Sequence, residues 1–221
     1  MSVEVLSPLL LTLKVAGLAT CIALILGIAL AFALSRSSFP GRDWFDAFLT
    51  LPMVLPPTVM GYYIIVAAGR NGFIGRWLDH AFGFSLMFTW QGAVIAASIV
   101  SLPMVLKSAR AAFEGVSPDF ENAARTLGQS EALVFCRVTL PLAWRGILAG
   151  AMLAFARAMG EFGATLMVAG NLPGRTQTLS LAIYDAVQSG NDSLCMELVL
   201  ITSAACMVVL VFSGKLLGAE H

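Results

Sequence analysis

Residues 15–34 read VAGLATCIALILGIALAFAL, an apolar run without a single charged residue. An α-helix rises 1.5 Å per residue, so about 20 apolar residues cross the ~30 Å hydrocarbon core of a bilayer. The run is too long for the hydrophobic segment of a cleavable signal, and no cation precedes Lys14. We therefore expect it to form the first membrane helix and to stay in the protein.

Similar runs recur along the 221 residues, of which 58% are hydrophobic and 12% are charged. A soluble domain of this size needs more polar surface to cover its core. Five membrane spans are predicted, at about 9–34, 48–68, 90–112, 142–168 and 194–217. The sequence therefore predicts an all-α, polytopic integral membrane protein that forms one transmembrane domain over residues 1–221.

The cations between these spans predict the orientation, because cytoplasmic loops carry an excess of Lys and Arg. With the N-terminus outside, the cytoplasmic side holds Arg36, Arg42, Lys107, Arg110, Arg125, Arg137, Arg145 and Lys215. The outer side holds Arg70, Arg76 and Arg175. This orientation places the polar connection at about 113–141 in the cytoplasm and the connection at about 170–193 in the periplasm.

The outer connection has its own helical signal. Leu179, Ile183 and Val187 recur at helical spacing between two groups of turn residues. The pattern indicates a short helix that either lies at the outer surface or enters the membrane as a sixth, re-entrant element.

Several classes of function are disfavoured. The formal net charge is zero, so nothing indicates a nucleic-acid partner. The four cysteines (Cys21, Cys136, Cys195 and Cys206) form no CxxC pair, and His80 and His221 lie far apart, so no metal site is expected. The chain contains no HExxH helix and no GxxxxGK[ST] loop. We expect no catalytic residues and no bound cofactor, and any ATP and Mg would be used by a partner subunit.

The cytoplasmic connection 117–141 reads SPDFENAARTLGQSEALVFCRVTLP and predicts two short helices. Ser117 is a candidate N-cap, and Pro118 suits the first helical position. Gly128 supplies the left-handed stop of the first helix, and Ser130 precedes the second, which we expect to end at Pro141.

The first of these helices is amphipathic. Phe120, Ala123, Ala124 and Leu127 form one apolar stripe, and Glu121 lies off it. A helix of about 10 residues is marginal alone in water, so the stripe should be buried. Two interpretations are open: the stripe packs on its own membrane domain, or it inserts into a groove on a soluble partner.

The stretch Glu121-x-Ala123-Ala124-x-x-x-Gly128, followed by Leu140-Pro141, resembles the EAA loop of ABC importer permeases. The usual glutamate of that loop directly precedes the two alanines, whereas Asn122 holds this place here. The resemblance implies a type I importer permease fold and a coupling helix seated in the ATPase subunit. The coupling residues would be Phe120, Glu121, Ala123, Ala124, Leu127, Gly128, Leu140 and Pro141.

Two features inside the predicted spans are candidates for the translocation pathway or gate. Pro56 and Pro57, followed by Thr58, interrupt the second span, and broken backbone at membrane depth must face other protein or water. A packing kink is the alternative.

The second feature is a pair of opposite charges in the fourth span. Arg157 and Glu161 share a helix face at i, i+4, and Gly163 follows. Each charge alone would cost about 2.5–3 kcal/mol at the bilayer centre, so we expect the two to pair. They form either a structural ion pair or part of a gate.

The similarity extends over nearly the whole chain. LPMVLPPTVMGYY, NAARTLG, FARAMGEFGAT and NLPGRTQTLSLAIYD resemble pieces of molybdate permeases, and sulfate/thiosulfate and tungstate permeases share several of them. The resemblance implies alternating access in the bacterial inner membrane by a lipid-embedded homodimer. Its partners would be two ATPase subunits and a periplasmic molybdate-binding protein. An ion channel or a membrane scaffold is the alternative from another class, although neither needs a capped, amphipathic loop.

Overall fold

The computed structural model describes residues 3–37 and 40–217, and no β-strand occurs in these two ranges. His221 lies outside them. The predicted all-α class is therefore confirmed. The elements are α1 (Val3–Arg36), α2 (Arg42–Val54), α3 (Pro57–Ala68), α4 (Phe73–Phe82), α5 (Trp90–Glu114), α6 (Pro118–Thr126), α7 (Glu131–Val134), a π-helical turn (Phe135–Thr139), α8 (Leu140–Met159), α9 (Gly163–Ala169), α10 (Leu179–Gln188) and α11 (Asp192–Leu217).

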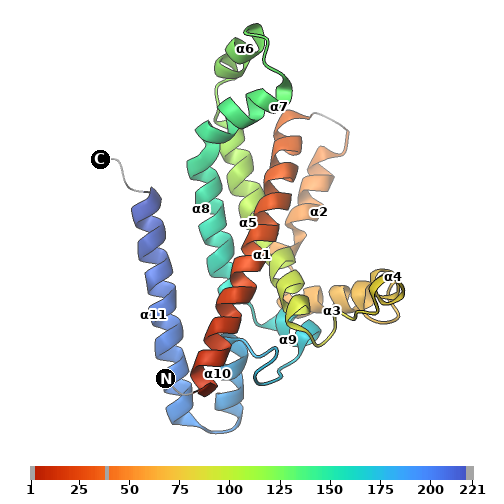
Figure 1. Cartoon of the computed structure of the whole chain (residues 1–221), viewed down its shortest axis with the longest axis vertical. Coiled ribbons are helices and arrows are strands. Elements are labelled where there is room, and N and C mark those ends of the chain that lie inside the picture. Colours follow the sequence, from red (N-terminus) through yellow and green to blue (C-terminus); the bar gives the residue numbers. More distant parts are fainter. Residues whose placement is uncertain (1–2, 38–39, 218–221) are drawn as a thin grey trace.

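Four stretches of helix are long and apolar enough to cross a membrane: Glu4–Arg36, Trp90–Glu114, Glu131–Met159 and Asp192–Val211. The pair formed by α2 and α3 makes a fifth if it is counted as one bent span. The long helices run roughly along one direction, while α3 and α4 extend sideways from the bundle (Figure 1). The polytopic architecture is confirmed.

Two predicted spans differ from the structure. The predicted span at 48–68 is divided into α2 and α3, which meet at an angle of 114°, and the break falls at Pro56 and Pro57, which cannot continue the ladder of helical hydrogen bonds. The span at 142–168 is also wrong at its outer end. There α8 stops at Met159, and the chain restarts as α9 at Gly163.

The core of the bundle is α5, against which α1 and α8 both pack. Small residues allow the close approach that holds membrane helices together. A Cβ atom added to Gly27 of α1 would lie 2.8 Å from Cγ1 of Val105, and one added to Gly146 of α8 would lie 2.5 Å from Cβ of Ala112. Van der Waals packing at these contacts therefore fixes the positions of α1 and α8 on α5.

Gly150 offers a test of this packing. A Cβ there would lie 2.8 Å from Cβ of Ser108 and 3.2 Å from Cα of Val105, so Gly150→Ala must push α8 away from α5. We expect a loss of about 1–3 kcal/mol of stability from overpacking, measured by thermal unfolding in detergent. Gly17→Ala is the matched control, because no atom lies within 4 Å of its added Cβ. Equal stability of the two variants would contradict the packing argument.

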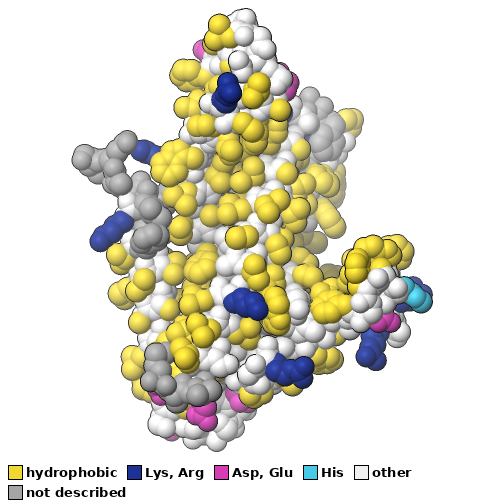
Figure 2. Space-filling view, viewed as in Figure 1, with side chains coloured by type: hydrophobic (Ala, Val, Ile, Leu, Met, Phe, Trp, Pro, Cys, Tyr) yellow, Lys and Arg dark blue, Asp and Glu magenta, His cyan; other side chains and the backbone are white. Residues whose placement is uncertain are grey.

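The predicted outer helix is confirmed as α10, and its ten residues are too few to span a bilayer. Its buried residues include Leu179, Ala182 and Ala186, which pack in a cluster with Val5 of α1 and Leu198 of α11. The backbone N–H of Leu179 also donates to Oγ1 of Thr12, at 2.8 Å. Apolar side chains cover much of the face of the molecule seen in Figure 2. Much of α11 beyond the cluster presents large apolar side chains outward, such as Leu200 and Val208. An outward apolar face of this kind suits contact with lipid.

Candidate functional site

Helix α6 lies at the far end of the bundle, on the side predicted to be cytoplasmic (Figure 1). Oγ of Ser117 accepts a hydrogen bond from the backbone N–H of Asp119 at 3.3 Å, and Pro118 occupies the first turn. Gly128 ends this segment with a left-handed φ of 81°, a conformation that glycine adopts without strain. The predicted N-cap and stop are confirmed.

The apolar stripe of α6 is largely exposed to solvent. The exposed fractions of Phe120 and Leu127 are 59% and 81%; Ala123 is also exposed and Ala124 is half-buried. The interpretation in which the stripe is buried against its own membrane domain is therefore wrong. A short helix with its apolar face exposed is typical of a surface that binds another protein.

Glu121, about 100° around α6 from Phe120, is the buried residue of this helix, with a side chain only 2% exposed. Its Oε1 accepts hydrogen bonds from Arg36 of α1 and from Oγ1 of Thr139, the latter at 2.7 Å. Arg125, one turn along α6, lies 3.6 Å from Oε2. Helical periodicity predicts that Glu121 lies off the apolar stripe. It does not predict that the side chain is buried, because its partner Arg36 is 85 positions away in the sequence.

A second ion pair holds α6 against the start of α7. Nε of Arg125 donates to Oε1 of Glu131 at 2.7 Å, and its NH1 group donates to Oδ1 of Asn122 at 2.9 Å. The hydrogen bond to Glu131 raises the pKa of the Arg125 guanidinium above its ordinary value, so this group stays charged. The bend between α6 and α7 is thus fixed by side chains as well as by Gly128.

The sequence predicts that the second helix ends at Pro141, and this prediction is wrong. The chain is helical without interruption from Glu131 to Met159, and Leu140 and Pro141 form the first residues of α8. The π-helical turn at Phe135–Thr139 lies directly before them. Such a turn holds one extra residue, which lets the helix accommodate a proline that has no N–H to donate.

Arg42, Asp46, Lys107, Arg110 and Glu114 form a separate charged cluster where α2 begins and α5 ends. Asp46 accepts from Nζ of Lys107 at 2.5 Å and lies 3.1 Å from NH1 of Arg110. Glu114 accepts from Nε of Arg110 at 2.8 Å and from NH2 of Arg42 at 3.3 Å. This cluster ties α2 to α5, and its ion pairs among the described residues do not involve α6.

The two candidate pathway segments each lie at a break between helices. Between α2 and α3, Pro56 and Thr58 are exposed and Pro57 is half-buried. Between α8 and α9, Gly160 ends the first helix and Glu161 is buried. Exposed, non-helical backbone at membrane depth needs water or another protein chain beside it, because lipid cannot satisfy it.

Arg157 and Glu161 pair as predicted, although they do not share one continuous helix. NH1 of Arg157 lies 2.8 Å from Oε2 of Glu161. Oε1 of Glu161 accepts from the backbone N–H of Ala164 at 2.9 Å, so the carboxylate also caps the start of α9. A negative charge at this position stabilises the positive end of the helix dipole.

The structure brings these two breaks together. A Cβ added to Gly163 would lie 2.9 Å from Cβ of Pro57 and 3.4 Å from the backbone nitrogen of Thr58. The N-terminal ends of α3 and α9 are therefore adjacent, with the Arg157–Glu161 pair at the start of α9. Gly163 thus forms one site with Pro57 and Thr58, which lie about a hundred positions earlier in the sequence. Only glycine fits at position 163.

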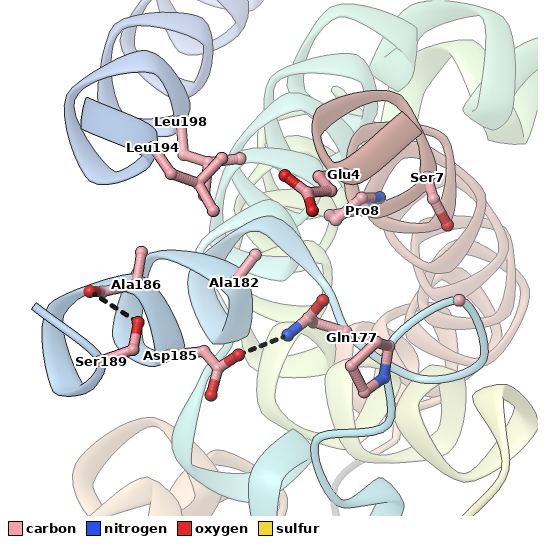
Figure 3. A pocket seen from close by; sticks show the side chains of 12 residues that line it. Glu4, Ser7, Pro8, Gln177, Ala182, Asp185, Ala186, Ser189, Leu194 and Leu198 are labelled. Atoms are coloured by element: carbon pink, nitrogen blue, oxygen red, sulfur yellow. Dashed lines mark hydrogen bonds between the residues drawn. The ribbon is translucent and has the colours of Figure 1, made fainter. Parts of the chain in front are cut away.

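A pocket of about 300 Å³ lies at the outer end of the chain, between α1, the segment before α10, and α11. Figure 3 shows Glu4 and Pro8 of α1 facing Leu194 and Leu198 of α11, while Asp185 of α10 accepts a hydrogen bond from Gln177 at 3.4 Å. The charged side chains that line it are the carboxylates of Glu4 and Asp185. Two acids in one pocket disfavour an anion there.

Comparison with known families and proteins extends this picture. The family described as "Binding-protein-dependent transport system inner membrane component" matches residues 23–219. The molybdenum transport system permease protein ModB of Escherichia coli (strain K12) is 46% identical over 205 residues, which cover 92% of this chain and 90% of ModB. The putative molybdenum transport system permease protein YvgM of Bacillus subtilis is 43% identical, with 95% and 90% coverage.

A sulfate permease is a more distant relative. The sulfate transport system permease protein CysT of E. coli is 34% identical and covers 84% of this chain and 67% of CysT.

Solved structures of ABC transporters share the fold. A chain of a bacterial transporter that imports alginate superposes with a TM-score of 0.79 at 15% identity, covering 99% of this chain and 80% of that one. A chain of the methionine transporter MetNI in an inward-facing conformation gives 0.73 at 13% identity, covering 97% and 95%. At these identities the likeness establishes the fold alone.

Proposed function

This chain belongs to the family of binding-protein-dependent transport system inner membrane components, and we propose that it is the permease subunit through which an ATP-driven importer carries molybdate into the bacterial cell. It is a multi-pass protein of the inner membrane with a type I ABC importer permease fold. The observation that carries the proposal is α6, whose apolar stripe is exposed while its one buried residue is a carboxylate. A helix built in this way docks on a soluble subunit.

The resemblance seen in the sequence is supported by the two molybdenum permeases, which match at 46% and 43% identity. The complex would contain a second copy of this chain, two cytoplasmic ATPase subunits and a periplasmic molybdate-binding protein. The permease would bind no cofactor of its own, and the ATPase subunits would hydrolyse ATP with Mg. Membrane lipid would surround the outward apolar face of α11.

Alternating access follows from the connection between α6 and the bundle. When the ATPase subunits close on ATP, α6 moves with them, and the unbroken helix from Glu131 to Met159 passes this movement to α8. The far end of α8 is the break at Gly160, which adjoins the break at Pro57. Movement of this kind would open and close a path beside the two breaks.

The charges beside the breaks suit an anion that passes without being held tightly. The positive ends of the α3 and α9 dipoles and the guanidinium of Arg157 attract a dianion, while the carboxylate of Glu161 opposes it. Selection among oxyanions would then be left to the periplasmic binding protein. The residues of this pathway would be Pro56, Pro57, Thr58, Arg157, Glu161 and Gly163.

The substrate is tested by reconstituting the permease with its ATPase in liposomes. We expect a binding protein loaded with molybdate to stimulate ATP hydrolysis and to drive uptake of labelled molybdate. Sulfate is the second candidate, favoured by the 34% identity to CysT, and tungstate is the third. Stimulation by a sulfate-loaded binding protein alone would assign sulfate instead. Equal flux with and without ATP would contradict an importer and indicate a channel.

A further inference from the structure

The buried carboxylate of Glu121 connects three separate elements. It lies on α6 and accepts hydrogen bonds from Arg36, in the last turn of α1, and from Thr139, in the π-helical turn before α8. A carboxylate removed from water is retained only where charged or polar partners compensate it. Arg36 and Arg125 provide compensating charge, and Thr139 provides a neutral donor. The side chain of Thr139 is buried as well.

The side chains of α6 divide into an exposed apolar group and a buried carboxylate. Phe120 and Leu127 are exposed, while the carboxylate of Glu121 is buried against α1 and the π-helical turn. A cavity of about 430 Å³ lies beside this contact. Its lining comes from α1, α6, α7 and the π-helical turn, and it includes Arg36, Glu121 and Thr139. This space allows α6 to move relative to α8. The contact between Glu121 and Arg36 therefore affects how such a movement reaches the membrane helices.

We propose that Glu121 is a positioning residue that transmits the movement of α6 to α1, and that it does not contact the ATPase. The inference rests on the proposed function of α6 as the coupling helix. The polypeptide itself joins α6 to α8 through α7. Glu121 supplies a second connection, through Arg36, to the first membrane helix. Because α1 packs on both α5 and α8, a displacement of its cytoplasmic end would also shift these two helices.

The resemblance to the EAA loop had placed Glu121 among residues seated in the ATPase. Its geometry favours a role inside the permease, because a side chain that is 2% exposed offers almost no surface to a partner. Asn122, which stands where the usual glutamate would be, is exposed. The displacement of the glutamate by one position therefore rotates it by about 100° around the helix, from the exposed side to the buried one.

The test compares Glu121→Gln, Arg36→Gln and the double variant in proteoliposomes that contain the permease, the ATPase and the loaded binding protein. We expect all three to retain the ATPase during purification and to hydrolyse ATP. Molybdate imported per ATP hydrolysed should fall about tenfold, within the usual range of coupling between sites. The double variant should be no worse than either single variant, because both substitutions break the same link.

Import per ATP is the decisive readout, because an unfolded fraction of the sample lowers import and hydrolysis equally and leaves the ratio of the folded complexes unchanged. Arg36→Lys keeps the positive charge and should retain most of the coupling. Comparison of Arg36→Lys with Arg36→Gln therefore tests the contact even if the Glu121 variant folds poorly. Glu114→Gln is the matched control, since Glu114 also pairs with arginines at this end of the bundle but joins α2 to α5. Its coupling ratio should match the wild type.

Three results would overturn the inference. The first is an import ratio for Glu121→Gln or Arg36→Gln within twofold of the wild type. The second is loss of the ATPase from the Glu121 variant alone, which would place this side chain in the docking interface. The third is a double variant whose loss is the product of the two single losses. If the wild-type complex imports no molybdate, the proposed substrate fails, and the same ratio is measured with the anion that it does import.

Discussion

Replacing Leu127 by glutamate should strip the ATPase subunits from the purified permease while the permease itself stays folded. Leu127 is 81% exposed and belongs to a stripe that is largely open to solvent in the described chain. A carboxylate at the centre of an apolar interface must lose its water without gaining a partner. We expect the amount of co-purified ATPase to fall more than about tenfold, which corresponds to at least ~1.4 kcal/mol of binding free energy.

The control for this experiment is Asn122→Glu. It adds the same charge to the same helix at an exposed position off the stripe, and it restores the residue that usually precedes the two alanines. Its complex should contain the normal amount of ATPase. Circular dichroism and thermal unfolding of both variants should match the wild type, because neither side chain contributes to the core. Normal assembly of Leu127→Glu would refute the assignment of α6 as the docking helix.

Arg157→Met should be the most destabilising single substitution inside the bundle. It leaves the buried carboxylate of Glu161 without the guanidinium that lies 2.8 Å away. Breaking a buried ion pair on one side costs about 3–5 kcal/mol, because the remaining charge has no compensation. Thermal unfolding in detergent should show this as a clear fall in Tm. Arg175→Met is the control, since this arginine lies in an exposed outer loop, and its Tm should stay near the wild type.

The partner substitution separates stability from transport. Glu161→Gln removes the charge but retains an amide oxygen that can accept from the backbone N–H of Ala164, so α9 keeps its cap. We expect the double variant Arg157→Met/Glu161→Gln to recover part of the lost stability, because no buried charge is left unpaired. If this recovered variant transports normally, the pair is structural. If it folds but transports poorly, the pair belongs to the pathway.

Much of the fold follows from local patterns in the sequence. The run from Val15 to Leu34, the first turn of α6 and the stop at Gly128 each depend on residues within a few positions of one another, and all three were predicted. Cation counting also placed α6 at one end of the bundle, where Arg36, Lys107 and Arg110 lie as well.

The features that the sequence did not predict depend on contacts between distant segments. Pro56 and Pro57 indicated a break, but the 114° turn at that break is set by how α3 packs on α9. The break between α8 and α9 lies inside the predicted span at 142–168, and Gly163 there adjoins Pro57, a contact that no local pattern indicates. Glu121 was assigned to the coupling loop without its partner, since no periodicity links it to Arg36.

The π-helical turn at Phe135–Thr139 has a consequence for how such permeases diverge. Because α7 and α8 form one continuous helix through this turn, the turn determines the angle around the helix axis at which α6 leaves the membrane bundle. Gain or loss of one residue there would swing α6 by about 100° around this axis without altering any helix in the membrane. Such a change would also separate Glu121 from Arg36, so the length of this turn and the contact between α6 and α1 have to change together.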